Sequence, residues 1–300
     1  MITIAHATDI HWYEPPRLSE IRGKRIMGTA NLFLRGRRHD FVEAAQAALV
    51  RHLVALSPDV FVLTGDLTAQ ALPRELDKAR SALGPVLSAG PSLVLPGNHD
   101  VYTWQGMLRG DFEARFGPWL HRDGAGLARL DCGPVTVLGL DASRPSVASA
   151  GQVPKTQLQR LEQVLADRTL RDRFVVLGLH YPLIDKNGQP NTNPFDGLLN
   201  ADAVIGTLAR APVRPDLILH GHVHELCKTA LQMPDGTSIP SINCGASGQA
   251  YQPERGRTAA MAVYDVERGH LVRIRRYFYD GHGFELERGP DFHERLPGAR

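Results

Sequence analysis

Short apolar runs alternate with helical patterns over roughly the first two thirds of the chain. Five of these runs are bounded by polar or turn residues and are predicted to be buried strands, at 1–8, 60–64, 92–95, 174–179 and 216–219. Apolar residues at helical spacing between them predict helices at about 41–56, 74–83, 111–116, 156–166 and 201–209. Asp40 is expected to cap the first helix and Pro154 to open the fourth. A hairpin turning at Gly133-Pro134 is predicted over 127–140.

The pattern changes after residue 225, where strand-like runs occur at 229–233, 238–243, 259–266 and 271–279. Mixed strand–helix units followed by a β-rich end indicate two sheets packed face to face, with helices outside. We expect a single domain over residues 1–300, with a basic and apolar insertion at about 15–39 and a β-rich part from about 226. The chain therefore belongs to the α/β class.

Composition narrows the partners that the chain can bind. A hydrophobic fraction of 43% and a charged fraction of 22% are typical of a globular protein. The net charge of +2 is too small to predict specific nucleic-acid binding, so an anionic partner must be recognised locally. The first residues do not resemble a signal peptide, and no run of about 18 apolar residues occurs. A cytoplasmic location is expected, and the oligomeric state stays open.

Side chains that can bind metal ions follow each of the five expected strands. They are Asp9 and His11, then Asp66, then Asn98, His99 and Asp100, then His180, and finally His222 and His224. Any one of them alone also fits a turn or a helix cap. Independent turns do not explain why all five groups stand at the same end of successive strands, where catalytic loops gather in α/β folds. The pattern therefore predicts a metal site.

Three histidines alternate between residues 220 and 224, and their spacing fits metal ligands, a proton relay or polar residues at a strand end. His220 precedes Gly221, whereas His222 and His224 follow it. We interpret His220 as a structural or supporting residue. Gly221 is expected to let the chain turn tightly between the sheet and the site.

The ordered blocks D-x-H, G-D, G-N-H-D, a lone H and G-H-x-H lie between residues 9 and 224 and resemble the calcineurin-like metallophosphoesterase family. The resemblance implies a four-layer αββα sandwich with two mixed β-sheets flanked by helices. It also implies two metal ions with Asp66 bridging between them, and a substrate-facing His99 that Asp100 helps to orient. The implied ligands are Asp9, His11, Asp66 and His224 for one ion, and Asp66, Asn98, His180 and His222 for the other. Many relatives have a histidine where this chain has Tyr181, a difference expected to affect the pocket more than the ions.

The ligand types fit phosphoester hydrolysis. Two cations about 3.5–4 Å apart lower the pKa of a bridging water and clamp the phosphoryl oxygens. Imidazole, carboxylate and amide ligands suit divalent or trivalent Mn, Fe, Zn or Co without selecting among them. A protonated His99 would stabilise developing charge or protonate the leaving oxygen.

The versions of the blocks in this chain most resemble the bacterial cyclic-nucleotide phosphodiesterase type. We therefore expect a hydrolase of cyclic nucleotides or of a broad range of phosphodiesters, rather than a phosphomonoesterase, acting on a small-molecule phosphoester. A non-catalytic binding scaffold of the same fold is the other class to consider. Scaffolds usually lose ligands or the substrate-facing histidine, whereas this chain keeps them all.

The insertion at about 15–39 interleaves arginines and lysine with apolar residues, and it has two interpretations. It is either a solvated basic face, or a flap beside Asp9 and His11 that attracts an anionic substrate or makes peripheral contact with an acidic membrane. The second interpretation would suit a membrane-associated hydrolase of nucleotide-linked lipid precursors. The polar loop at 181–197 is likewise either a lid or a mobile connection.

Overall fold

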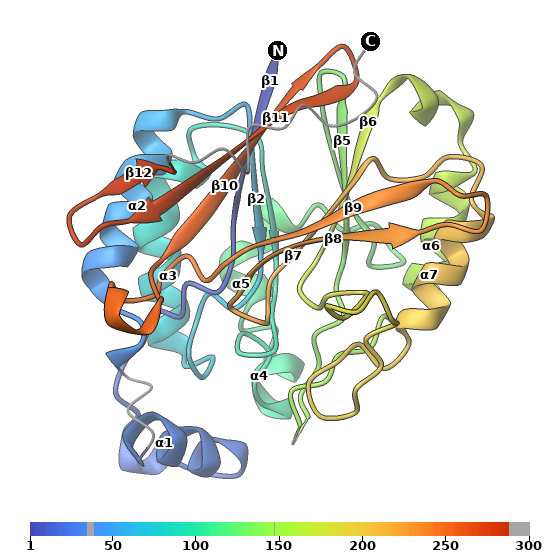
Figure 1. Cartoon of the computed structure of the whole chain (residues 1–300). Helices are drawn as coiled ribbons and strands as arrows, with labels where there is room; N and C mark the ends of the chain where they lie inside the picture. Colours follow the sequence, from blue (N-terminus) through green and yellow to red (C-terminus); the bar gives the residue numbers. More distant parts are fainter. Residues whose placement is uncertain (35–38, 147, 288–300) are drawn as a thin grey trace.

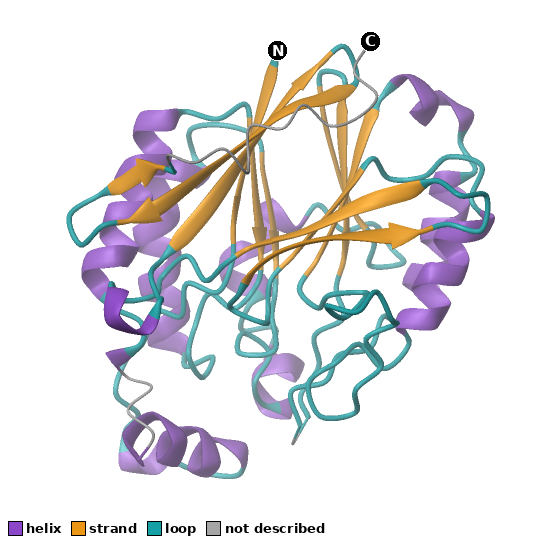
Figure 2. Cartoon of the chain, in the orientation of Figure 1, coloured by secondary structure: helices purple, strands orange, loops and turns teal. Residues whose placement is uncertain are grey.

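The computed structural model describes residues 1–34, 39–146 and 148–287, and its helices and strands form four layers (Figure 1). Two six-stranded sheets face each other, and helices cover their outer faces (Figure 2). The predicted αββα sandwich with two mixed sheets is therefore confirmed.

The first sheet has the strand order β12-β11-β10-β1-β2-β3. The neighbours β1, β2 and β3 run parallel, while β10, β11 and β12 add an antiparallel edge. Its strands are β1 (Ile2–Ala7), β2 (Val60–Thr64), β3 (Ser92–Leu95), β10 (Ala260–Glu267), β11 (His270–Tyr279) and β12 (Phe284–Leu286). Helices α2 (Glu43–Leu56), α3 (Pro73–Leu87) and α5 (Glu113–Leu120) cover its outer face.

The second sheet has the order β4-β5-β6-β7-β9-β8, with parallel central strands and an antiparallel strand at each edge. Its strands are β4 (Ala128–Cys132), β5 (Val135–Leu140), β6 (Phe174–Leu179), β7 (Leu217–His220), β8 (Leu226–Gln232) and β9 (Ser238–Cys244). Helices α6 (Lys155–Leu165) and α7 (Ala201–Arg210) cover its outer face. The β-rich end of the chain thus completes both sheets.

Strand β2 shows why the central strands read as continuous apolar runs. Val60 and Val62 lie in the core between the two sheets, whereas Phe61 and Leu63 lie in the core under the helices. Successive side chains of a strand point to opposite faces, and both faces of this sheet are covered. All five residues of the strand are therefore buried.

Several elements differ from the sequence predictions. Helix α2 begins at Glu43 after Val42, so Asp40 does not cap it; the Asp40 carbonyl instead accepts a hydrogen bond from the amide of Ala250 at 2.7 Å. The helices α1 (Lys24–Leu34) and α4 (Trp104–Arg109) were not expected, nor was β12. The 3₁₀ helices η1 (Leu18–Glu20), η3 (Arg168–Asp172) and η4 (Pro253–Arg255) also lie within the described residues.

The predicted insertion contains η1 and α1, and α1 lies outside the four layers, at the lower left of Figure 1. Residues 35–38 of the insertion lie outside the described part of the chain. Within the described ranges, no helix is both long enough and apolar enough to cross a membrane.

Candidate metal centre

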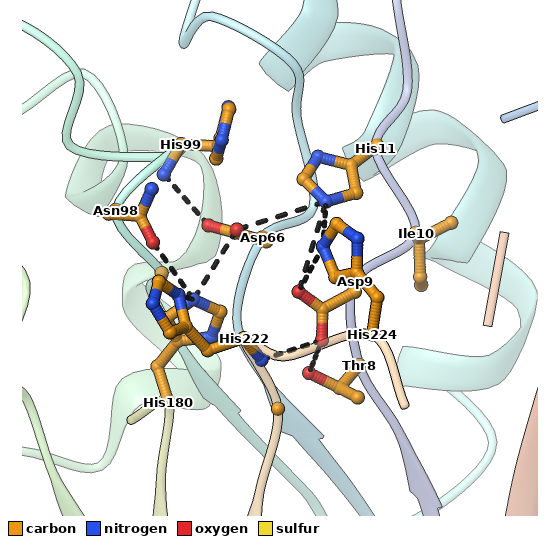
Figure 3. A network of polar contacts seen from close by, with 12 residues as sticks. Thr8, Asp9, Ile10, His11, Asp66, Asn98, His99, His180, His222 and His224 are labelled. Carbon is orange, nitrogen blue, oxygen red and sulfur yellow. Dashed lines mark hydrogen bonds and ion pairs between the residues drawn. The ribbon is translucent and has the colours of Figure 1, made fainter. Parts of the chain in front are cut away.

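The loops after β1, β2, β3, β6 and β7 meet at one edge of the two facing sheets, and the predicted ligands converge there (Figure 3). Parallel strands place their carboxyl ends at the same edge, so residues distant in sequence become neighbours. The structure brings together all of the predicted ligands, namely Asp9, His11, Asp66, Asn98, His180, His222 and His224.

One group of ligand atoms comes from Asp9, His11, Asp66 and His224, all within 4.8 Å of one another. The His224 Nε2 atom lies 3.2 Å from Asp9 Oδ1, and the His11 Nε2 atom lies 3.8 Å from Asp66 Oδ2. The second group contains Asp66, His180 and His222. Asp66 thus belongs to both groups, as expected of a bridging carboxylate.

The second group closes around His180. Its Nε2 atom lies 3.3 Å from Asp66 Oδ2, 3.1 Å from Asn98 Oδ1 and 3.3 Å from His222 Nδ1. Asn98 therefore places its amide oxygen beside the imidazole of His180. Its contact completes a mixed imidazole, carboxylate and amide set.

Backbone carbonyls fix which ring nitrogen each of three histidines turns toward the centre. A carbonyl oxygen can only accept, so the contacting ring nitrogen carries the proton and the other keeps a lone pair. The donor–acceptor pairs are His11 Nδ1 with Thr68 at 3.2 Å, His180 Nδ1 with Thr64 at 2.8 Å, and His222 Nε2 with Asp196 at 2.7 Å. His222 therefore offers Nδ1 to the centre, while the other two offer Nε2.

The atoms at the centre fit a cation. Within the described residues, Asp9 Oδ1 is a buried oxygen with no hydrogen-bond partner, and it faces the rings of His11 and His224. The Nε2 atoms of those two rings lie only 3.1 Å apart. A buried carboxylate oxygen without a partner is costly, and a shared metal ion would satisfy it together with the ring lone pairs.

The protonation of the centre follows from burial and charge. Burial disfavours the charged imidazolium, lowering the pKa of His11 to about 3 and of His222 to about 4. At His180 burial acts in the same direction, but the carboxylates of Asp66 and Asp9 outweigh it and raise the pKa to about 9. Burial would raise the pKa of Asp66, yet His180 and His99 hold it well below its ordinary value. Metal binding would displace the proton of His180.

Five ligand residues have left-handed backbone geometry, which is uncommon for residues other than glycine. The φ angles are 52° at Asp9, 54° at His11, 55° at Asp66, 75° at His222 and 56° at His224. Such geometry costs on the order of 1–3 kcal/mol at a residue and persists only where the surrounding structure imposes it. The loops therefore hold the ligand backbone in place at a cost in stability.

Two glycines allow the loops to approach each other. A Cβ atom on Gly221 would lie 2.5 Å from Asp9 Oδ2, and one on Gly97 would lie 2.7 Å from the Asp66 carboxyl carbon. Neither residue is among the positive-φ glycines of the described chain. Gly221 is therefore required for space beside Asp9, whereas the sequence had suggested a need for conformational freedom.

His99 and Asp100 occupy different surroundings. The His99 Nδ1 atom donates to the Ala69 carbonyl at 2.6 Å, which leaves Nε2 available on the cavity side. The Asp100 carboxylate accepts hydrogen bonds from the amides of Leu67, Thr68 and Gly97, at 2.9–3.0 Å. Burial raises the pKa of Asp100 to about 7. In this structure Asp100 joins the loops after β2 and β3, while the carbonyl of Ala69 orients the His99 ring.

The structure also places His220 and Tyr181, two residues next to the predicted ligands. His220 is buried at the end of β7, with its Nδ1 atom 3.4 Å from the Gly221 carbonyl oxygen. Tyr181 is fully buried, and its ring centre lies 4.7 Å from that of His222 and 5.2 Å from that of His180. Tyr181 thus packs against the rings of two candidate ligands. The sequence had led us to expect that this residue would affect the pocket more than the metal ions.

Sequence reasoning missed residues that support the ligands. The Thr8 hydroxyl donates to Asp9 Oδ2 at 2.8 Å, and the Phe41 ring packs 4.3 Å from the His11 ring, centre to centre. The Asp196 carbonyl, which orients His222, belongs to the polar loop at 181–197. None of these contacts has a spacing signal, because each depends on how distant segments pack together.

A cavity of about 630 Å³ opens beside the centre. His11, His99 and His224 form one wall, and aromatic side chains of Tyr13, Phe41, Tyr102 and Phe278 lie around it. The insertion contributes Lys24 and Met27. The cavity therefore gives a ligand access to the atoms that would hold the metal ions.

Comparison with known proteins bears on the fold and the family of the chain. A dimetal phosphatase from Danio rerio has a similar structure, with a TM-score of 0.58, 16% identity, and coverage of 95% of this chain and 98% of that one. A purple acid phosphatase from yellow lupin seeds has a TM-score of 0.56 at 12% identity, covering 95% of this chain, which spans about half (53%) of that protein. At such identities the likeness concerns the fold. None of the curated proteins compared matches the sequence significantly. The family described as calcineurin-like phosphoesterase matches residues 2–226, and the chain belongs to that family.

Proposed function

We propose that the protein is a phosphodiesterase dependent on two transition-metal ions, acting on cyclic nucleotides or on a broad range of phosphodiesters. The observation that carries the proposal is the pair of ligand groups sharing Asp66 at the edge of a large cavity. Manganese, iron, zinc and cobalt all suit these ligands. We also propose that the protein acts in the cytoplasm.

The bound ions would supply charge neutralisation and a hydroxide near neutral pH. The chain itself contributes His99, whose Nδ1 proton is held by the Ala69 carbonyl. Its Nε2 atom is then the ring atom that can hold a proton for the leaving oxygen. Burial lowers the pKa of His99, whereas the Asp66 carboxylate raises it and a bound anionic substrate would act in the same direction.

The extent of the cavity supports a diester. Its lining includes the apolar and aromatic residues Phe41, Leu226 and Phe278, together with Tyr102 beside His99. A diester carries two organic groups on phosphorus, and a cavity of this volume with apolar and aromatic lining would accommodate them.

The test is kinetic profiling of the metal-reconstituted protein on cyclic nucleotides, linear diesters and monoesters in parallel. We expect kcat/KM for diesters to exceed that for monoesters with the same leaving group. Monoesters hydrolysed faster than diesters would contradict the diester preference. A protein with two ions bound that hydrolyses none of the panel would instead support the binding scaffold.

A second candidate is a membrane-associated hydrolase of nucleotide-linked lipid precursors. It is favoured by the exposed apolar side chains of the insertion, where Leu18 is 90%, Ile26 56% and Met27 58% exposed. Basic residues Arg17, Arg22 and Arg25 lie among them. Apolar side chains beside basic ones suit peripheral contact with an anionic membrane.

Co-sedimentation with vesicles that contain anionic lipid tests this candidate. Binding that is lost when Leu18, Ile26 and Met27 are replaced by serine would support it. Val54→Ser is the matched control, because Val54 is 46% exposed on α2, outside the insertion. A wild-type protein that stays in the supernatant would exclude the membrane-associated alternative.

A further inference from the structure

Lys24, the first residue of α1, holds its ammonium group in an unusual environment. Its Nζ atom is buried and has no hydrogen-bond partner within the described residues. It lies 4.4 Å from the ring centre of Tyr102. A cation–π contact stabilises such a group by less than the free energy that burying an ammonium without hydrogen bonds costs. The contact with Tyr102 therefore does not explain why the charge is buried there.

The packing of α1 sets the position of Lys24. The adjacent Arg25 donates hydrogen bonds to the carbonyls of Gln70 at 3.2 Å and Ala71 at 3.0 Å, in the loop after β2. One turn further along, α1 approaches Tyr102 so closely that a Cβ atom on Gly28 would overlap the Tyr102 hydroxyl. Contacts on two loops thus fix the start of α1 against the body of the protein.

This position faces the metal centre. Lys24 lines the same cavity as His11, His99 and His224. The Tyr102 ring that contacts the ammonium lies 5.7 Å from the His99 ring, centre to centre. Burial lowers the pKa of Lys24, and the Asp66 carboxylate is the charge that opposes the effect. The ammonium is therefore within electrostatic reach of the bridging carboxylate.

We propose that Lys24 binds a phosphoryl oxygen of the substrate, so that the insertion supplies an anion-binding residue to the cavity. The inference rests on the proposed function, since it names the side chain that recognises the phosphoryl group. A lysine ammonium binds phosphate as a point charge with three donors, and here the nitrogen has no hydrogen-bond acceptor within the described residues. The substrate would then supply the hydrogen-bond acceptor that the described residues do not provide.

The test measures anion binding to the metal-loaded protein by titration calorimetry, with inorganic phosphate and inorganic pyrophosphate as probes. Lys24→Met removes the charge and keeps the length of the side chain, and Lys24→Arg keeps the charge. Lys155→Met is the matched control, because Lys155 is exposed at the start of α6, away from the cavity. Metal content is determined for each variant by mass spectrometry.

We expect Lys24→Met to retain two ions and to weaken anion binding about tenfold to a hundredfold, the effect of losing a charged hydrogen bond. Lys155→Met should bind as the wild type does, and Lys24→Arg should recover part of the affinity. Weaker binding of both probes would place Lys24 on the phosphoryl group at the ions. Weaker binding of pyrophosphate alone would place it on a second phosphoryl group.

The melting temperature distinguishes anion binding by Lys24 from a purely structural role, in which the substitution would lower it. Lys24→Met removes an unpaired buried charge, so without phosphate its melting temperature should equal or exceed that of the wild type. A lowered melting temperature with unchanged binding of both probes would overturn the proposal. So would a metal-loaded wild type that binds neither probe.

The outcome is separable from that for the proposed function, because anion binding requires no turnover. A wild type that binds phosphate through Lys24 but hydrolyses no ester would refute the phosphodiesterase and leave the Lys24 assignment intact. Full hydrolysis of diesters with unchanged anion binding in Lys24→Met would support the phosphodiesterase and refute the Lys24 assignment.

Discussion

Thr8→Val is the sharpest test of how the metal centre is built. The Thr8 side chain is fully buried, and its hydroxyl donates to Asp9 Oδ2 at 2.8 Å. Valine has nearly the same shape, so the substitution removes one donor and leaves the backbone hydrogen bonds with Ser247 in place. Among the described residues, Asp9 Oδ2 then keeps the hydrogen bond from the amide of His222, at 2.9 Å.

The expected effect follows from that single hydrogen bond. A hydrogen bond to a charged group contributes about 1.5–3 kcal/mol, and each 1.4 kcal/mol changes an equilibrium tenfold. Removing a group that orients a metal ligand typically weakens metal affinity about 10–100-fold. Asp9 belongs to only one of the two ligand groups. Thr8→Val should therefore weaken the affinity for one ion by about 10–100-fold and leave the affinity for the other ion unchanged.

Competition with a chromophoric chelator measures both affinities in one titration. Thr207→Val is the matched control, since Thr207 is buried in α7 and its hydroxyl donates to the Ala203 carbonyl, far from the centre. Unchanged affinities in Thr8→Val, or an equal loss at both ions, would refute the assignment of Asp9 to a single site.

Four further substitutions test the metal centre and the buried strand β1 that leads to it. Asp66→Asn should lose both ions and activity together, because Asp66 is the residue that the two ligand groups share within the described chain; retention of one ion at wild-type affinity by mass spectrometry would argue against bridging. His99→Ala should keep both ions but lower kcat by about 10²–10⁴-fold, and full turnover by the metal-loaded variant would remove its assigned role. Gly221→Ala should lower both the melting temperature and metal content, because its methyl group would displace Asp9 or Thr8. Burial, with His220, lowers the pKa of His6 to about 3, so this histidine stabilises the fold above pH 6.5 and the contribution is lost as the pH falls toward 3. Between pH 7.5 and pH 5, the free energy of unfolding measured with urea should fall by up to about 2 kcal/mol less for His6→Gln than for the wild type. An identical fall in the two proteins would contradict this prediction.

The ligand positions were predictable because they combine two local signals. Each apolar run identifies a strand by its own residues, and each is closely followed by a side chain that can bind metal ions. Parallel strands in a sheet then bring these ends together regardless of the loops between them. Asp9, Asp66 and His180 could therefore be placed at one edge before the structure was known.

The supporting contacts were not predictable, because they depend on segments that meet only in the folded protein. Thr8 has no motif of its own, and the carbonyl that orients His222 comes from a loop without regular structure. Asp40 matches the residue preference of a helix cap, yet its backbone pairs with Ala250 from beyond β9, and the helix starts later. Lys24 reads as one of many basic residues in the insertion until α1 is placed against Tyr102.

The left-handed backbone at the ligands has a consequence for how this protein could diverge. At Asp9, His11, Asp66, His222 and His224 the side chain is retained although glycine would adopt the backbone geometry without strain. A descendant released from metal binding would gain stability by replacing these residues with glycine. Glycine at several of the five positions would therefore identify a non-catalytic descendant from its sequence, even where every strand and loop length is unchanged.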